Sequence, residues 1–170
     1  MNANVKEYLF CIDVHDILLR ASTLTAVLGA SRTDGQGMLL YDFLRLTDDD
    51  GLVVQQLLRE SLPELHSRLL AYRPRSAYHP DTPLPADADT RPVAHIDIVL
   101  QLPRPAFDVA ADLNESLLDY WAYTVVGGWL LLKKPDEAAL FTARAAACLD
   151  RITVLLNKRR RPILRRPRWF

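Results

Sequence analysis

The side chains that most often carry out chemistry in proteins are few in this sequence and far apart. No two of its four histidines have the i, i+4 spacing of a zinc site on a helix, and its two cysteines form no Cys-x-x-Cys pair. Two cysteines are also too few for a disulfide framework, which favours a reducing compartment. We therefore predict no metal site. These residues are His15, His66, His79, His95, Cys11 and Cys148.

Two groups of acidic residues lie close together along the chain. His15 stands between Asp13 and Asp16, and residues 48–50 are three consecutive aspartates. Oxygen-rich clusters suit Mg²⁺ or Ca²⁺, but consecutive residues on a helix point in different directions. Carboxylates at a helix start satisfy exposed amides and complement the positive end of the helix dipole. We therefore predict helix capping at 48–50 rather than cation binding, and a surface helix end at the His15 cluster rather than proton transfer.

Motifs of phosphate-binding and hydrolytic enzymes are absent from the sequence. Residues 35–37, Gly-Gln-Gly, lack the further glycine and the lysine of a loop that holds phosphate. Gly127 and Gly128 lie inside a helical pattern, and no serine stands in a nucleophile elbow. We expect a protein that is not an enzyme and binds no cofactor.

The most distinctive segment is the C-terminal arm, residues 158–170, which contains seven basic residues and no acidic one. All 21 acidic residues and 14 of the 21 basic residues precede it, so residues 1–157 carry a formal charge of −7 and the arm carries +7. Pro162 and Pro167 prevent a continuous helix, so an extended arm is expected. The residues we predict to bind a partner are Arg159, Arg160, Arg161, Arg165, Arg166, Arg168, Trp169 and Phe170.

Three interpretations of the arm compete. Its cations could bind nucleic-acid phosphates while its aromatic rings stack on bases. It could be a solvated charged tail, although Trp169 and Phe170 are poorly suited to water. It could dock on another protein, including the acidic body of an adjacent copy, and we favour this interpretation because body and arm have complementary charges in a ring.

The apolar spacing predicts the elements of the first half of the chain. Residues 8–12 fit either a strand or the start of a helix. A helix is expected over 14–29, ended by Gly29, with its apolar stripe formed by Val14, Ile17, Leu18, Ala21, Leu24, Val27 and Leu28. Extended chain follows over 38–46.

A second helix should start at the Thr47 cap and run to about Tyr72, with a kink or break at Pro63, where Ser61 and Glu64 form a candidate capping box. Its core face would include Leu52, Val53, Leu57, Leu58, Leu62, Leu65 and Leu69.

The second half begins with a proline-rich loop, residues 73–92, and a strand over 93–102 whose residues alternate with a period near two. A helix capped by Asp108 or Asp112 should run to Lys134 as the most buried one, with its two glycines where another element approaches closely.

Pro135 then starts the last helix, which should form an antiparallel hairpin with the helix before it. Its expected core face comprises Leu140, Ala143, Ala147, Leu149, Ile152, Leu155 and Leu156. No stretch reaches the roughly 18 apolar residues needed to span a membrane, and no secretory signal is evident. We predict a mainly α domain, residues 1–157, with about four helices and a small β element, followed by the arm.

Several segments together resemble small head-to-tail connector proteins of tailed bacteriophages and prophages of gut bacteria, including the crAss-like group. The resemblance runs from about Val14 to the end. Its segments are 46–50 opening a long helix, the strand 95–103 followed by Phe107-Asp108, the helical segment 120–132, the last helix, and the ending 159–170.

The resemblance implies a structural subunit of a homo-oligomeric ring that joins portal to tail in the virion neck, assembled in the host cytoplasm. Such proteins contact portal and tail or adaptor proteins, and arginines facing the channel could touch genomic DNA non-specifically. The proline-rich loop matches nothing in that family. The alternative from the residues themselves is a nucleic-acid-binding protein that uses the arm.

Overall fold

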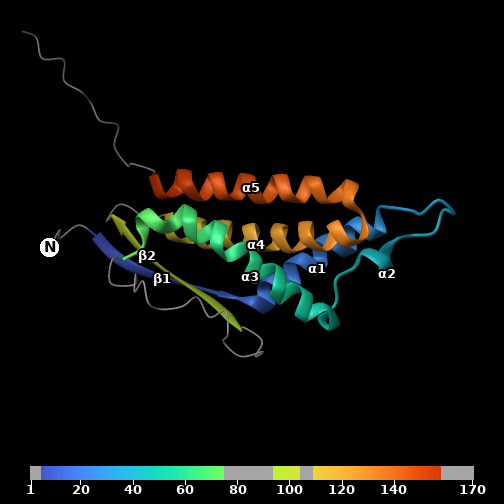
Figure 1. Ribbon diagram of the computed structural model, residues 1–170, viewed down its shortest axis with the longest axis horizontal. Coiled ribbons are helices and arrows are strands. Elements are labelled where there is room, and N and C mark those ends of the chain that lie inside the picture. Colours follow the sequence, from blue (N-terminus) through green and yellow to red (C-terminus); the bar gives the residue numbers. More distant parts are fainter. Residues whose placement is uncertain (1–4, 75–93, 104–108, 158–170) are drawn as a thin grey trace, which may run out of the picture.

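A computed structural model describes residues 5–74, 94–103 and 109–157 of this chain. They form a mainly helical domain with a two-stranded sheet, as predicted, and the long helices run along its longest dimension (Figure 1). The elements are β1 (Val5–Asp13), α1 (Val14–Ala30), α2 (Tyr41–Leu44), η1 (Asp48–Asp50), α3 (Gly51–Leu69), η2 (Leu70–Tyr72), β2 (His95–Pro103), α4 (Ala110–Lys133) and α5 (Pro135–Asn157).

The sheet consists of two strands, β1 and β2, which lie far apart in the sequence. β1 and β2 are antiparallel, with Leu9 opposite Val99 and Phe10 opposite Ile98. One face is buried and the other is exposed, as the alternation in 93–102 predicts, since Ile98 is buried while Asp97 is exposed. Pairing with β2 therefore decides that residues 8–12 are a strand. The buried side chains are Phe10, Ile12, Ile96, Ile98, Leu100 and Leu102.

Helix α1 starts where it is predicted, because Asp13 Oδ1 accepts a hydrogen bond from the His15 amide at 2.8 Å. Two details of the prediction are wrong. Val27 is 65% exposed, since the buried line follows steps of four residues through Ile17, Ala21, Thr25 and Gly29. Gly29 also does not end the helix; it is buried against α2.

The segment 38–46 is not wholly extended, because it contains the short helix α2. Leu44 and Leu46 on its C-terminal side are fully buried. Two hydrogen bonds hold them: the Trp129 indole donates to the Leu44 carbonyl at 2.8 Å, and the Leu46 amide donates to Thr25 Oγ1 at 3.0 Å. These partners lie on α1 and α4, so the local sequence does not contain the reason for the turn.

Helix α3 has the predicted start but not the predicted break. The Asp50 carboxylate accepts from both the amide and the hydroxyl of Thr47 at 2.9 Å. The helix is continuous through Pro63, and the Ser61 hydroxyl donates to the Leu58 carbonyl at 2.7 Å instead of capping a new helix. Leu58, Leu65 and Leu69 are buried on both sides of the proline, whereas Leu52 is 82% exposed and not in the core.

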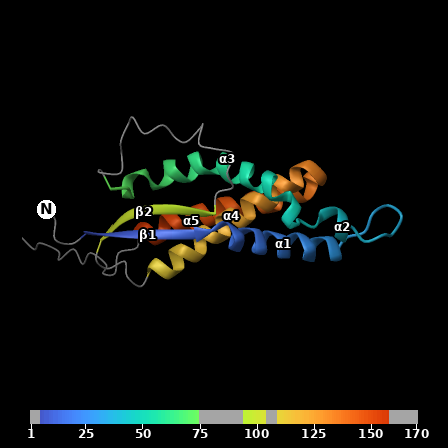
Figure 2. The ribbon, with the colours of Figure 1, turned by 90° about the horizontal axis from the view of Figure 1, so that it is seen from below.

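Helices α4 and α5 form the predicted antiparallel hairpin and lie side by side along the domain (Figure 1). α4 is the most buried helix, with α3 and α1 on opposite sides of it (Figure 2). The N-cap of α4 is Val109, whose side chain makes no capping hydrogen bond, and Asp112 lies in the first turn of the helix. Asp108 lies outside the described residues. Both glycines lie at close contacts, Gly127 against Thr142 and Gly128 against Leu57.

The core face of α5 differs from the prediction in its N-terminal half. Leu140, Ala143 and Ala147 are exposed. Packing against α4 turns a neighbouring face inward, and periodicity alone does not separate the two faces in so alanine-rich a helix. The buried residues are Ala138, Phe141, Ala145, Leu149, Ile152, Leu155 and Leu156.

Gly29 gives a stability prediction. A Cβ at this position would lie 2.7 Å from Tyr41 Cα and 3.1 Å from the Leu40 carbonyl oxygen, both backbone atoms that cannot rotate away. Gly29→Ala should lower the free energy of unfolding by about 1–3 kcal/mol. Urea unfolding followed by circular dichroism measures this. Gly51→Ala, where a Cβ meets no atom within 4 Å, is the control and should be neutral or slightly stabilising; equal effects of the two would contradict the contact.

Candidate functional site

All eight residues predicted to bind a partner lie outside the described residues, as does most of the proline-rich loop. The structure does place Tyr72 and Asn157, the residues that precede the two segments. The Tyr72 hydroxyl donates to Asn157 Oδ1 at 2.6 Å, which joins η2 to the last residue of α5. The chain therefore enters the loop and the arm from the same end of the domain (Figure 1).

The connection between α1 and η1, a loop with the short helix α2, lies at the opposite end (Figures 1 and 2). Its exposed large side chains are Met38, Leu39 and Phe43, which are 67%, 62% and 51% exposed. Lys133 Nζ lies 5.0 Å from the Phe43 ring and donates to the Phe43 carbonyl at 3.0 Å, so the base of this loop is tied to the end of α4. Apolar residues on a projecting loop suit contact with another protein.

The acidic groups lie at helix starts, as predicted. Asp13 accepts a hydrogen bond from the His15 amide in the first turn of α1, and Asp50 accepts from the amide and hydroxyl of Thr47, the residue before η1. His95 Nδ1 lies 3.9 Å from Asp13 Oδ2. Within 5–74, 94–103 and 109–157, no three histidine, cysteine, aspartate or glutamate side chains are grouped to hold a metal ion. In the same part of the chain, no helix has the length and apolar character needed to cross a membrane.

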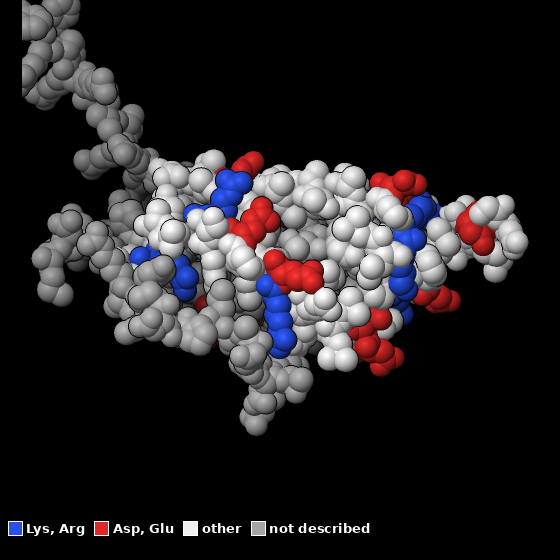
Figure 3. All heavy atoms as spheres, in the orientation of Figure 1, with Lys and Arg blue, Asp and Glu red and all other residues white. Residues whose placement is uncertain are grey.

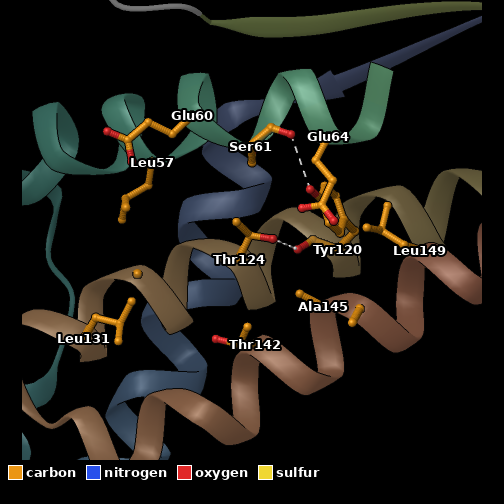
Figure 4. Close-up of a pocket in the computed structure, with 12 residues that line it drawn as sticks. Leu57, Glu60, Ser61, Glu64, Tyr120, Thr124, Leu131, Thr142, Ala145 and Leu149 are labelled. Carbon is orange, nitrogen blue, oxygen red and sulfur yellow. Dashed lines mark hydrogen bonds between the residues drawn. The ribbon is translucent and has the colours of Figure 1, made fainter. Parts of the chain in front are cut away.

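An open groove lies between α3 and α5, with α4 as its floor (Figure 4). Its volume is about 340 Å³. Small residues hollow it: Gly128 on α4 lets Leu57 approach closely, and the α5 wall consists of small side chains and Leu149. The lining residues are Leu57, Glu60, Ser61, Glu64, Tyr120, Thr124, Gly128, Leu131, Thr142, Ala145, Ala146 and Leu149.

The serine and threonine hydroxyl groups that line the groove are engaged within their own helices. Ser61 donates to the Leu58 carbonyl at 2.7 Å, Thr124 to the Tyr120 carbonyl at 2.8 Å, and Thr142 to the Ala138 carbonyl at 3.1 Å. Each is therefore directed at backbone rather than at a ligand. The groups left to bind a partner are apolar carbon and two carboxylates.

The two carboxylates, Glu60 and Glu64, lie on the α3 side of the groove (Figure 4). Glu60 accepts a hydrogen bond from the side-chain amide of Gln56 at 3.0 Å. Neither glutamate has a cationic partner among the described residues. Acidic side chains border the hollow in the space-filling view (Figure 3). The described lining contains no lysine or arginine, so the groove attracts cations.

Tyr120 lies on the floor of the groove, and its hydroxyl donates a long hydrogen bond of 3.4 Å to the Ser61 carbonyl. Burial raises the pKa of Tyr120 to about 12, and the nearby Glu64 carboxylate adds to the rise, because both disfavour a phenolate. The phenol is therefore neutral at physiological pH, and the negative charge of the groove comes from its glutamates.

Sequence reasoning did not find this groove. Two signals were available: a like-charge pair at i, i+4 in Glu60 and Glu64, which is mildly unfavourable in an isolated helix, and the small residues Thr142, Ala145 and Ala146 at steps of three and four. Neither signal says that α3 and α5 flank the same stretch of α4. That arrangement comes from tertiary packing.

Comparison with known proteins identifies no relative: no family model, no curated protein and no solved structure matches this chain.

The position of Tyr120 near Glu64 predicts how the pKa of the phenol changes when the carboxylate is removed. Glu64→Gln should lower the Tyr120 pKa from about 12 toward 10, because removal of the carboxylate makes the phenolate less unfavourable. Since the folded-state pKa is raised, the stability given by neutral Tyr120 is present below pH 10 and is lost between pH 10 and about 12. NMR of the tyrosine Cζ carbons, assigned with Tyr120→Phe, measures the pKa. Glu60→Gln is the control; an equal shift there would contradict a specific effect of Glu64.

Proposed function

We propose that this chain is a non-enzymatic structural subunit of a tailed-phage head-to-tail connector, a homo-oligomeric ring that joins portal to tail through protein–protein contacts. The observation on which the proposal rests is the division of charge, −7 over residues 1–157 and +7 over residues 158–170. Opposite charges on two parts of one chain favour contacts between copies, because the arm of each copy complements the body of the next.

The arrangement of the described surfaces supports this proposal. The arm starts at one end of an elongated domain, beside the start of the proline-rich loop, and the exposed loop with Met38, Leu39 and Phe43 lies at the other end. A subunit of a connector has partners at both ends. The serine and threonine hydroxyls of the groove bond to carbonyls of their own helices, which favours binding over catalysis.

Nucleic-acid binding is the second candidate, and the seven cations of the arm favour it. The groove of the body is acidic, however, so a duplex would be repelled there. On this proposal any DNA contact is non-specific and limited to arm residues that face the channel of a ring.

Neutralising the arm distinguishes the two candidates. In full-length chain, Arg165→Ser, Arg166→Ser and Arg168→Ser together should abolish docking to the portal and ring formation, because three of the seven cations are lost. Electron microscopy of the chain, alone and mixed with portal protein, gives the readout. Ring formation by the native chain that survives the substitutions, or a native chain that never docks, would contradict the proposal.

The control is binding to a duplex oligonucleotide, followed by anisotropy over a range of salt concentrations. A connector subunit should bind duplex weakly and without sequence preference. Tight binding whose salt dependence falls when the three arginines are replaced would instead identify a DNA-binding protein.

A further inference from the structure

The groove between α3 and α5 combines features that define its partner. It offers apolar carbon from Leu57, Leu131 and Leu149, and it carries two carboxylates without a cation among the described residues that surround them. A partner that fits must present apolar side chains next to positive charges. Such a segment belongs to this chain itself.

We propose that this groove is the docking site for the C-terminal arm, residues 158–170, of an adjacent copy of the chain. The inference rests on the proposed assembly function and names the surface that receives the arm. Apolar anchors from the pairs Ile163-Leu164 or Trp169-Phe170 fill the hollow, and neighbouring arginines pair with Glu60 and Glu64.

The chemistry of the two partners is complementary. A volume of about 340 Å³ admits one large aromatic side chain with part of a second residue, and an anchor in a pocket is the feature that dominates interface energies. Arginine binds a carboxylate through two parallel hydrogen bonds, and the stagger of Glu60 and Glu64 by one helical turn suits two arginines of an extended strand. Apolar burial gives affinity, and the ion pairs fix direction and register.

The direction of α5 selects another copy over the same chain. Leu149, the last α5 residue that lines the groove, precedes the helix end at Asn157 by eight residues, or about 12 Å. The groove runs back along α5 from there. The arm has two prolines and no glycine, which favours an extended chain that continues past the helix end. Thirteen extended residues span up to about 43 Å, enough to reach a neighbouring copy.

Cysteine cross-linking of full-length chains tests the proposal. The background carries Cys11→Ser and Cys148→Ala, which remove the native thiols. One chain carries Ala146→Cys in the groove and a second, of different mass, carries Arg168→Cys in the arm. Ala146 is exposed, so its substitution leaves the core intact. Oxidation of the mixture should give a disulfide-linked heterodimer at a rate that rises with protein concentration.

The matched control replaces Ala146→Cys by Ala143→Cys, an exposed residue of the same helix outside the groove, and should cross-link at least tenfold more slowly. Equal rates at the two positions, or no heterodimer, would overturn the proposal. A single chain carrying both Ala146→Cys and Arg168→Cys tests the alternative source. A rapid intramolecular disulfide, independent of concentration, would show that the arm folds back on its own body and would also overturn the proposal.

A charge test uses the same assay. Glu60→Gln with Glu64→Gln should slow the cross-link about tenfold at low salt, because two ion pairs are lost. Asp42→Asn with Asp49→Asn removes the same charge from exposed residues outside the groove and should leave the rate unchanged. An equal reduction in both would mean that only net charge matters, which overturns docking in the groove. Ring formation without a cross-link at Ala146→Cys would refute this inference alone. A cross-link without ring formation would refute the connector function alone.

Discussion

Burial of α4 is the constraint on which the rest of the structure depends. Eleven of its 24 residues are buried, among them Tyr120, Trp121 and Trp129. Removing a side chain of this kind from water stabilises a fold by about 1.5–3 kcal/mol, so no other helix contributes as much. α1, α3 and α5 each pack against it, and Arg20 of α1 forms ion pairs with Glu115 and Asp119 of α4. The other helices take their positions from this contact.

The groove is a consequence of that arrangement. α3 and α5 pack on different faces of α4 and approach each other only at their edges, so the stretch of α4 from Tyr120 to Leu131 is covered incompletely. Small residues on α5 keep the space open where large ones would fill it. Because the hydroxyls nearby bond to backbone carbonyls, the surface combines apolar carbon with the charges of Glu60 and Glu64.

The acidic groove lies on the part of the chain that carries the excess of negative charge. A formal net charge of zero conceals two opposite charges of seven on a body and an arm. Electrostatic attraction between exposed charges falls off over about 8–10 Å at physiological ionic strength, so these charges act at short range. The groove and the loop with Met38, Leu39 and Phe43 add exposed apolar surface to these charges. Charged and apolar surfaces are both present on the described domain.

The sequence alone was sufficient for elements whose signals are local. The period of two in 95–102, the helix start at Val14, the Thr47 cap and the Pro135 start of α5 each depend on residues a few positions apart. Signals that need a distant partner were misread or ambiguous: the strand at 8–12, the α2 turn, the unbroken α3 at Pro63, the exposed Val27 and the rotated face of α5. The groove belongs to the second group, because it consists of side chains from three helices that only packing brings together. Periodicity reports which residues are apolar, whereas the choice among apolar faces is made by the neighbours that cover them.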